Sequence, residues 1–238
     1  MDTYKVNDIG ELIKDNSYVG RGIVIGITQD GKKAAVAYFI MGRSANSRNR
    51  VFYLKENELF TKAFDESKLE DPSLIIYAPI RQVGSSLMVT NGDQTDTVAR
   101  FLKEGKTFEE ALETRCFEPD SPNFTPRISG IITLGEKPAY KMSILKSGDS
   151  EGSICNRYTF SYEAKAGLGH FIHTYEGDGN PIPTFCGEPE RVKIPDDLDE
   201  FTDNLWANLN EDNKISLYVR YVDLESGDFE DRLINKNK

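Results

Sequence analysis

The chain has 238 residues, 38% hydrophobic and 11% aromatic, which is enough to bury one large core, so we expect a single domain over residues 1–238. Its formal net charge of -10 excludes broad binding to nucleic acids or membrane surfaces, because both polyanions would repel it. The N-terminus lacks the basic and then apolar layout of a secretory signal, and no apolar run approaches the roughly 20 residues that cross a bilayer. We therefore expect a cytoplasmic protein whose partners are small molecules.

Cysteine and histidine are scarce, and their spacing does not suggest a metal site. Cys116, Cys155 and Cys186 are far apart without a Cys-x-x-Cys spacing, so we interpret them as inert or buried thiols. His170 and His173 would point to opposite faces of a strand, which is wrong for joint metal binding. The glycine-rich segments match neither the Rossmann nor the P-loop pattern, and there is no Gly-x-Ser-x-Gly elbow for a nucleophilic serine.

The first part of the chain is predicted to form strands. Short segments rich in β-branched or aromatic residues alternate with Gly, Asp-Gly or polar turns. These segments cover residues 19–28, 34–41, 50–55, 74–80 and 86–90, with a hairpin turn at 29–31.

Helical periodicity follows, over residues 96–104 and 107–115, with Gly105 between the two helices. Thr107 and Glu110 have the spacing of a capping box. Strands are then predicted at 127–134, 139–146, 154–162 and 168–175, followed by a helix at 198–209 and a strand at 215–222. Runs of strands, then helices, then strands indicate an α+β protein rather than alternating βαβ units.

Charge is segregated along this acidic chain. Residues 31–55 contain no Asp or Glu but six basic side chains, and two further acid-free stretches, 73–92 and 121–135, each carry one arginine, Arg81 and Arg127. Arginine beside Ser, Thr, Asn and Gly is typical of an oxyanion or phosphate site, where guanidinium groups and backbone N–H groups donate hydrogen bonds. A solvated strand face with one basic side chain is the alternative for any single stretch.

The segment TNGDQTDTVARFL joins a predicted strand to a helix. Asp93 or Thr95 would cap this helix, whose N-terminus could bind an anion or orient an amide. Asp96 lies in the first turn, where a carboxylate either stabilises the helix dipole or serves as a catalytic or ribose-binding group. The sequence leaves both roles open for Asp96.

Five of these segments, in order, resemble the archaeal-type IMP cyclohydrolases and their bacterial relatives. They read YVGRGIVIG, VAYFIMGRSANSRNR, YAPIRQVG, TNGDQTD and NFTPRISG, and HTYEGDGNPIPTF looks like the closing strand of the family. The resemblance is dense from Tyr18 to about Gly130 and becomes weaker from about residue 177. It implies a four-layer αββα sandwich resembling the N-terminal-nucleophile hydrolases, and cyclisation of the formamido-imidazole-carboxamide ribonucleotide FAICAR to IMP.

Two departures from these patterns are informative. The chain begins Met1-Asp2, without the terminal Ser, Thr or Cys nucleophile of that hydrolase group, so covalent catalysis by the first residue is not expected. Gln94 stands where the family's NGxHTD pattern has histidine, which puts proton transfer at that position in doubt.

The resemblance assigns the candidate site residue by residue. Catalytic candidates are Arg21, Tyr38, Asp96 and Arg127, and substrate-binding candidates are Arg43, Ser44, Arg48, Arg81, Asn91, Gly92, Thr95 and Thr125. Arg50 lies just outside the matching pattern and is the weaker candidate.

The implied reaction needs few parts, because the carboxamide nitrogen and the formyl carbon belong to one molecule. We hypothesise that Arg43 and Arg48 grip the phosphate and that Asn91 and Asp96 orient the base or ribose. Arg21, Tyr38 and Arg127 would then line the reacting end. Neither metal nor organic cofactor is expected. Another amidohydrolase on the same fold and a non-catalytic purine-nucleotide-binding protein remain the alternatives, and the oligomeric state, a homo-oligomer included, stays open.

Overall fold

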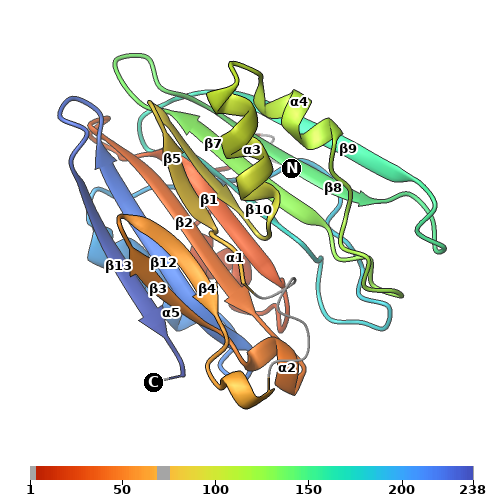
Figure 1. Ribbon diagram of the computed structural model, residues 1–238. Helices are drawn as coiled ribbons and strands as arrows, with labels where there is room; N and C mark the ends of the chain where they lie inside the picture. The colour runs from red at the N-terminus through yellow and green to blue at the C-terminus, as the bar shows by residue number, and fades with distance from the viewer. Residues whose placement is uncertain (1–3, 69–75, 238) are drawn as a thin grey trace.

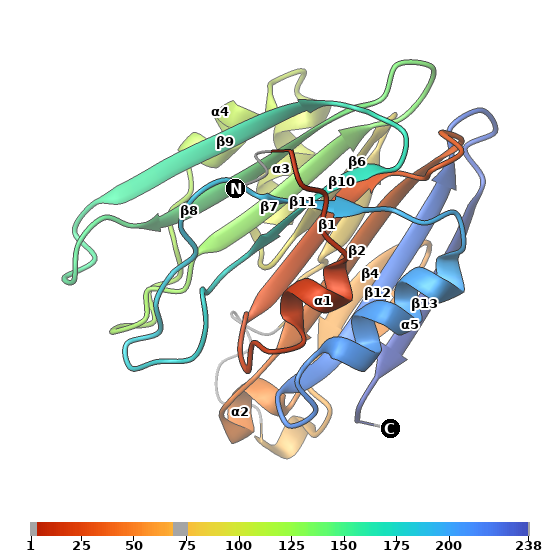
Figure 2. The same cartoon turned by 180° about the vertical axis from the view of Figure 1, so that it is seen from behind.

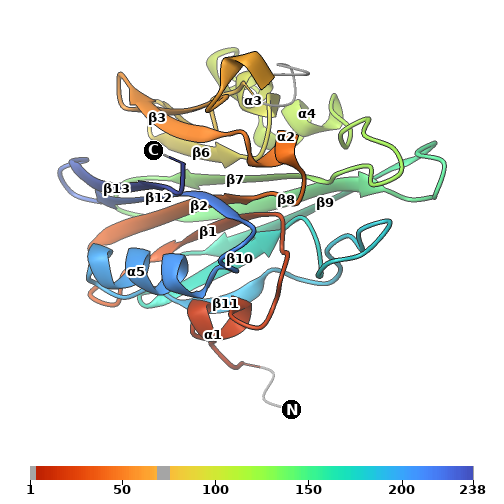
Figure 3. The same ribbon diagram turned by 90° about the horizontal axis from the view of Figure 1, so that it is seen from below.

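The computed structural model describes residues 4–68 and 76–237, and it places two antiparallel sheets face to face between two layers of helices (Figures 1 and 3). Sheet A has the strand order β11-β10-β1-β2-β12-β13. Its strands are β1 (Arg21–Ile27), β2 (Lys33–Met41), β10 (Leu168–His173), β11 (Glu190–Lys193), β12 (Lys214–Asp223) and β13 (Phe229–Asn235).

Sheet B follows the chain, in the order β3-β4-β5-β6-β7-β8-β9. Its strands are β3 (Val51–Lys55), β4 (Glu58–Lys62), β5 (Ile80–Val83), β6 (Ser86–Thr90), β7 (Arg127–Thr133), β8 (Ala139–Ser147) and β9 (Cys155–Glu163). Each strand pairs with the next along the sheet, so hairpin connections alone explain most of this topology.

The central strands of sheet A are apolar on both faces because both faces are covered. In β1, Ile23 and Ile25 pack toward sheet B, whereas Val24 packs toward the outer helices. In β2, Tyr38 likewise packs toward sheet B, and Phe39 packs toward the outer helices. Each fully buried aliphatic side chain of this kind stabilises the fold by roughly 1.5–3 kcal/mol relative to an exposed one.

The two sheets contact each other where β7 crosses β1. A Cβ atom added at Gly130 would lie 2.5 Å from Cδ1 of Ile25, so a larger residue at this point of β7 would force the Ile25 side chain to move. Val89 and Ile128 of sheet B belong to the same buried cluster as Ile23 and Ile25. This inter-sheet core fixes the strand ends around which the site is built.

The outer layers consist of two helix pairs. Helices α1 (Ile9–Ile13) and α5 (Leu198–Asn208) cover the outer face of sheet A (Figure 2). Helices α3 (Gln94–Lys103) and α4 (Phe108–Glu113) cover sheet B. The short α2 (Ala45–Arg48) and the 3-10 turn η1 (Glu66–Lys68) lie between strands. The predicted α+β class and the four αββα layers are thus confirmed; the likeness to N-terminal-nucleophile hydrolases stays a prediction.

Most predicted elements occur within one or two residues of their expected bounds, and the Thr107 capping box is present. The structure adds α1, α2, β4, β11 and β13, which were not predicted. The strand predicted at 74–80 lies partly outside the described residues. Within the described part, β5 begins only at Ile80, because Pro79 has no N–H group to donate a hydrogen bond to a neighbouring strand. Among the described residues, none of the helices has the length and apolar character needed to cross a bilayer.

Candidate active site

A cavity of about 240 Å³ opens at the end of the sheets beside α2. Arg21 is the first residue of β1, Arg43 follows the end of β2, and Arg50 precedes β3, so the sheet topology gathers three arginines here. The lining residues are Tyr18, Arg21, Arg43, Ser44, Ser47, Arg50, Glu118, Asp120, Asn123, Thr125, Tyr175 and Ile182.

Two of these arginines are buried, and neither forms an ion pair within 4.0 Å in the described part of the chain. Arg21 is 8% exposed and Arg50 is 6% exposed, and the Nε atom of each is buried without a hydrogen-bond partner in the described part of the chain. Burial, together with the neighbouring Arg21, lowers the pKa of Arg50. A buried, unpaired guanidinium is costly, so these two side chains favour an anion or an electron-rich oxygen in the cavity.

Two carboxyl groups line the cavity, Glu118 and Asp120, and of these Glu118 is the buried one, with 4% exposure. Burial raises the pKa of Glu118, although Arg21 and Arg127 act in the opposite direction. Burial lowers the pKa of Arg21, but attraction to Glu118 outweighs it and leaves the pKa of Arg21 raised. Across the described ranges no ion pair within 4.0 Å joins Glu118 to either buried arginine. The carboxyl group is therefore available for proton transfer.

The loop that carries Glu118 is held by its own hydrogen bonds. The backbone N–H of Glu118 donates to Thr125 O at 2.9 Å, and Thr125 N–H donates to Asp120 Oδ1 at 2.6 Å. The Thr125 hydroxyl also lies 2.6 Å from the Tyr175 hydroxyl. The loop between α4 and β7 thus holds Glu118 in the same cavity as Arg21 of β1.

Tyr38 and Tyr77 form a pair behind the arginines. Their hydroxyl oxygens are 2.8 Å apart, and both side chains are buried. Burial raises the pKa of Tyr38 well above its ordinary value, and that of Tyr77 as well, so both remain neutral hydrogen-bond donors at neutral pH. Tyr38 does not line the cavity itself; it interacts electrostatically with Arg21 and Arg50.

Arg43 lies at the mouth of the cavity. Its Nη1 donates to Gly179 O at 2.8 Å and pairs with Asp178, and its guanidinium carbon lies 5.2 Å from the Tyr18 ring centroid. Ser44 caps α2 by accepting a hydrogen bond from Ser47 N–H. Both predicted residues therefore border the cavity, as do Arg21 and Thr125.

Arg81 and Asp96 do not line this cavity. Arg81 donates to Glu58 at 2.9 Å and forms an ion pair with Asp96, on the outer side of sheet B. The Arg48 guanidinium instead holds Gly42 O at 3.0 Å and Asn213 Oδ1 at 2.8 Å, so its bonds link α2 to other loops.

The TNGDQTD turn is largely buried and does not line the cavity; its hydrogen bonds stabilise the structure behind it. Asn91 accepts from Ile128 N–H at 2.9 Å, and the Thr95 hydroxyl donates to Gly92 O at 3.1 Å. Asp93 stands at the N-cap of α3 but makes no side-chain capping bond, because its carboxylate pairs with Arg115 and Arg127. The prediction that Asp93 or Thr95 caps α3 is confirmed in that Asp93 is the N-cap residue, although no side-chain capping bond accompanies it.

Arg127 lies in this support, behind Glu118. It is 7% exposed, and its Nη1 donates to Gln94 Oε1 at 2.7 Å and lies 2.8 Å from Asp93 Oδ1. A Cβ atom at Gly92 would lie 2.4 Å from Nη1 of Arg127, which explains the glycine. Arg127 thus acts on Glu118 through its charge and does not line the cavity.

Sequence reasoning missed Glu118 and Tyr77, and it ranked Arg50 low. The segment CFEPDSPN that carries Glu118 has no periodicity, and its only signal is that it directly precedes NFTPRISG. Arg50 belongs to the acid-free stretch 31–55, so the charge pattern indicated it even though the family pattern did not.

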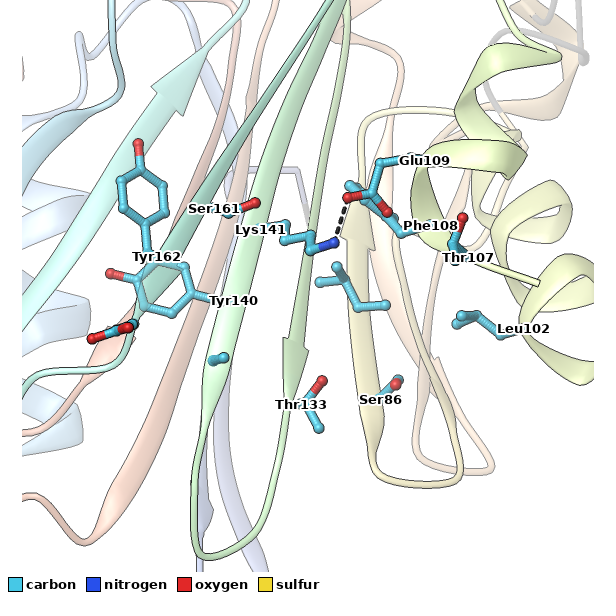
Figure 4. A pocket seen from close by; sticks show the side chains of 13 residues that line it. Ser86, Leu102, Thr107, Phe108, Glu109, Thr133, Tyr140, Lys141, Ser161 and Tyr162 are labelled. Atoms are coloured by element: carbon cyan, nitrogen blue, oxygen red, sulfur yellow. Dashed lines mark hydrogen bonds and ion pairs between the residues drawn. The ribbon is translucent and has the colours of Figure 1, made fainter. Parts of the chain in front are cut away.

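A larger cavity of about 570 Å³ lies outside sheet B beside α4 (Figure 4). Lys141 and Glu109 form an ion pair across it, and Ser86, Thr133 and Ser161 contribute hydroxyl groups. Its lysine is already neutralised, so this groove lacks the unpaired positive charge of the smaller cavity. The smaller cavity, which is lined by buried arginines and by Glu118, is therefore the better candidate for the active site.

The fold and this cavity define a four-layer α+β protein with a buried cationic pocket suited to a small anionic ligand. Comparison of the sequence with known proteins narrows this class. The chain belongs to the family described as IMP cyclohydrolase-like protein, whose sequence profile matches residues 18–227.

Individual relatives agree with this assignment. The chain is 34% identical over 154 residues to a protein named IMP cyclohydrolase from Methanopyrus kandleri, covering 59% of this chain and 75% of that protein. A Methanococcus aeolicus protein of the same name is 30% identical over 163 residues, covering 67% and 74% of the two chains. One from Methanocaldococcus jannaschii is 28% identical over 175 residues, covering 72% and 81%.

Proposed function

We propose that this chain is an IMP cyclohydrolase, an enzyme that converts FAICAR to IMP by dehydrating ring closure. The observation that carries the proposal is the pair of buried arginines, Arg21 and Arg50, whose Nε atoms have no hydrogen-bond partner among the described residues and which face the same cavity as the buried carboxyl group of Glu118. Its membership of the family and the names of its relatives support the same reaction.

Ring closure forms one bond and releases one water. The carboxamide nitrogen attacks the formyl carbon and loses one proton; the formyl oxygen then leaves as water, and the formamido nitrogen gives up the second proton. Both reacting groups are tethered, so holding the near-attack rotamer supplies much of the acceleration. The residual task is to move protons and to stabilise charge on the formyl oxygen.

The cavity provides groups for both tasks. Arg21 and Arg50 would donate hydrogen bonds to the formyl oxygen as negative charge grows on it. Glu118, as a carboxylate, would accept the amide proton, and its raised pKa suits it to return a proton to the departing oxygen. Tyr38 and Tyr77, which are hydrogen-bonded to each other, would act on the two arginines through electrostatic interactions.

The mouth of the cavity would bind the rest of the nucleotide. Arg43 can exchange its contact with Asp178 for the substrate phosphate, and Ser44 and Thr125 offer hydroxyl groups beside it. Arg48, Arg81 and Asp96 have their bonds satisfied elsewhere, so we leave them out of the substrate site. Asn91, Gly92, Thr95 and Arg127 would act by supporting the Glu118 side of the cavity.

The proposal is tested by following FAICAR with the purified full-length chain by ultraviolet absorbance. Formation of IMP is expected. Tight binding of purine nucleotides without turnover would instead indicate a nucleotide-binding protein, and release of a different product would indicate another amidohydrolase on this fold. We expect the reaction to take place in the cytoplasm, and size measurement of the same sample would show whether a homo-oligomer forms.

A further inference from the structure

Two cysteines that are distant in sequence lie next to each other in space. Cys116 follows α4, Cys155 begins β9, and the Cys155 thiol is within hydrogen-bonding reach of the Cys116 side chain. Cys116 is exposed, Cys155 is half-buried, and both are reduced. Nothing in the spacing of the two residues along the sequence reveals this pair, because it forms only where β9 begins beside the loop after α4.

The backbone around the two thiols is held independently by Arg157. Its Nη2 donates to Arg115 O at 2.8 Å, and its Nη1 donates to Cys155 O at 3.2 Å, so one guanidinium links both segments. Cys155 also packs against the apolar cluster beneath α3 and α4. The two segments are therefore kept side by side in the folded protein.

We propose that Cys116 and Cys155 form a reversible disulfide, which makes this pair a redox modification site. The exposed thiolate of Cys116 attacks a disulfide oxidant such as oxidised glutathione, forming a mixed disulfide and releasing one glutathione thiolate. Cys155, as thiolate, then attacks the Cys116 sulfur and releases the second glutathione. Two protein thiols are oxidised, two protons are released, and the oxidant takes up two electrons.

Cys116 attacks the oxidant first because its thiol is exposed, whereas the Cys155 thiol is half-buried. Burial raises the pKa of the Cys155 thiol, and so does its neighbour Cys116. Cys155 is thus the poorer first nucleophile, and it becomes reactive once the mixed disulfide places a sulfur beside it.

The disulfide would act on the candidate active site through the chain. Cys116 precedes Glu118 by two residues, and the same loop carries Asp120, Asn123 and Thr125 of the cavity lining. Tying Cys116 to β9 shifts the start of this loop. This part of the inference rests on the proposed function, since it needs Glu118 to be catalytic, whereas formation of the disulfide does not.

The site itself is tested by equilibrating the full-length chain in glutathione buffers of stepped redox ratio, trapping free thiols by alkylation and mapping the peptides by mass spectrometry. The three thiols of the reduced chain should fall to one, with a peptide that joins Cys116 to Cys155. The Cys186→Ser variant, which changes the third and unpaired thiol, should form the same bond. In Cys116→Ser the Cys155 thiol should stay reduced.

Two results would overturn the site: glutathione left on Cys116 with Cys155 still free, or wild-type protein that keeps all three thiols under oxidising ratios. The wild-type measurement decides this even if a cysteine variant folds poorly.

The regulatory effect is measured as kcat of oxidised and reduced samples. Because a misplacement of about 1 Å can cost on the order of 100-fold in rate, we expect roughly tenfold lower kcat in the oxidised form, reversed by dithiothreitol and absent in Cys116→Ser. Equal kcat in both forms would refute coupling to the site. A chain that forms the bond but never converts FAICAR would instead refute the proposed function.

Discussion

Arg127 donates a hydrogen bond of 2.7 Å to the side chain of Gln94 inside the protein. Gln94 is fully buried, and its Nε2 donates to Asn91 Oδ1 at 3.0 Å and to Ile128 O at 3.2 Å. The side-chain amide of Gln94 thus accepts a hydrogen bond from the Arg127 guanidinium through its oxygen and donates one to Asn91 through its nitrogen.

Replacing Gln94 with leucine should destabilise the fold, because Arg127 and Asn91 each lose a buried partner. We expect the free energy of unfolding in urea to fall by about 2–4 kcal/mol. The Gln82→Leu variant, in the exposed part of β5, should change it little. Equal unfolding free energies for the two variants would show that the Gln94 network contributes nothing.

Arg50→Met should separate stability from binding. Arg50 is buried and its Nε has no hydrogen-bond partner among the described residues, so an apolar side chain of similar length should raise the free energy of unfolding by about 1 kcal/mol or more. The same change should weaken IMP binding, measured by calorimetry. Arg100→Met, on the exposed face of α3, should alter neither quantity. A destabilised variant that binds IMP normally would contradict the assignment of Arg50 to the site.

Arg43→Met should raise KM strongly and change kcat little, since the side chain lies at the mouth and away from Glu118 in the loop. Losing one charge-assisted contact corresponds to a KM increase of roughly tenfold or more. Steady-state kinetics with FAICAR measure both constants, and Arg100→Met again serves as the control. An unchanged KM would remove Arg43 from the phosphate site.

His170 should make stability depend on pH. Burial and Arg191 lower the pKa of His170 from 6.5 to about 4, and its Nδ1 lies 2.6 Å from the Tyr140 hydroxyl. Between these two values the unfolded chain binds the proton and the folded chain does not, so stability falls as pH drops from 6.5 toward about 4.

The difference in unfolding free energy between wild type and His170→Gln, measured across that window, isolates this histidine from the carboxylates that titrate nearby. The difference should shift in favour of the variant as the pH falls. A constant difference would mean that His170 is protonated equally in both states.

The fold was predictable to the extent that burial is periodic. Apolar residues fill strands β1, β2, β6 and β7, so the sequence predicted these strands. It did not predict β4 (ELFTK) and β13 (FEDRLIN), because both carry charged residues at exposed or partly exposed positions. α1 has only five residues and α2 four, too few to show a helical period.

The site was predictable in its chemistry but only partly in its members. The acid-free stretch 31–55 contained Arg43 and Arg50, and the family resemblance pointed to Arg21; all three line one cavity. The acid-free stretches also contained Arg48 and Arg81, whose partners Asn213 and Glu58 come from distant parts of the chain that a local pattern does not reveal. Glu118 was missed because its environment is made by chain segments that are distant in sequence, and no local spacing encodes it.

The most direct test of the central claim is kcat for FAICAR cyclisation by Glu118→Gln, with Glu113→Gln, an exposed glutamate at the end of α4, as the matched control. General acid–base catalysis contributes roughly 100- to 10,000-fold, so kcat of the first variant should fall by about 100-fold or more while IMP binding persists. The control should keep the wild-type rate. A Glu118→Gln enzyme that turns over FAICAR at the wild-type rate would contradict the assignment of this cavity as the active site.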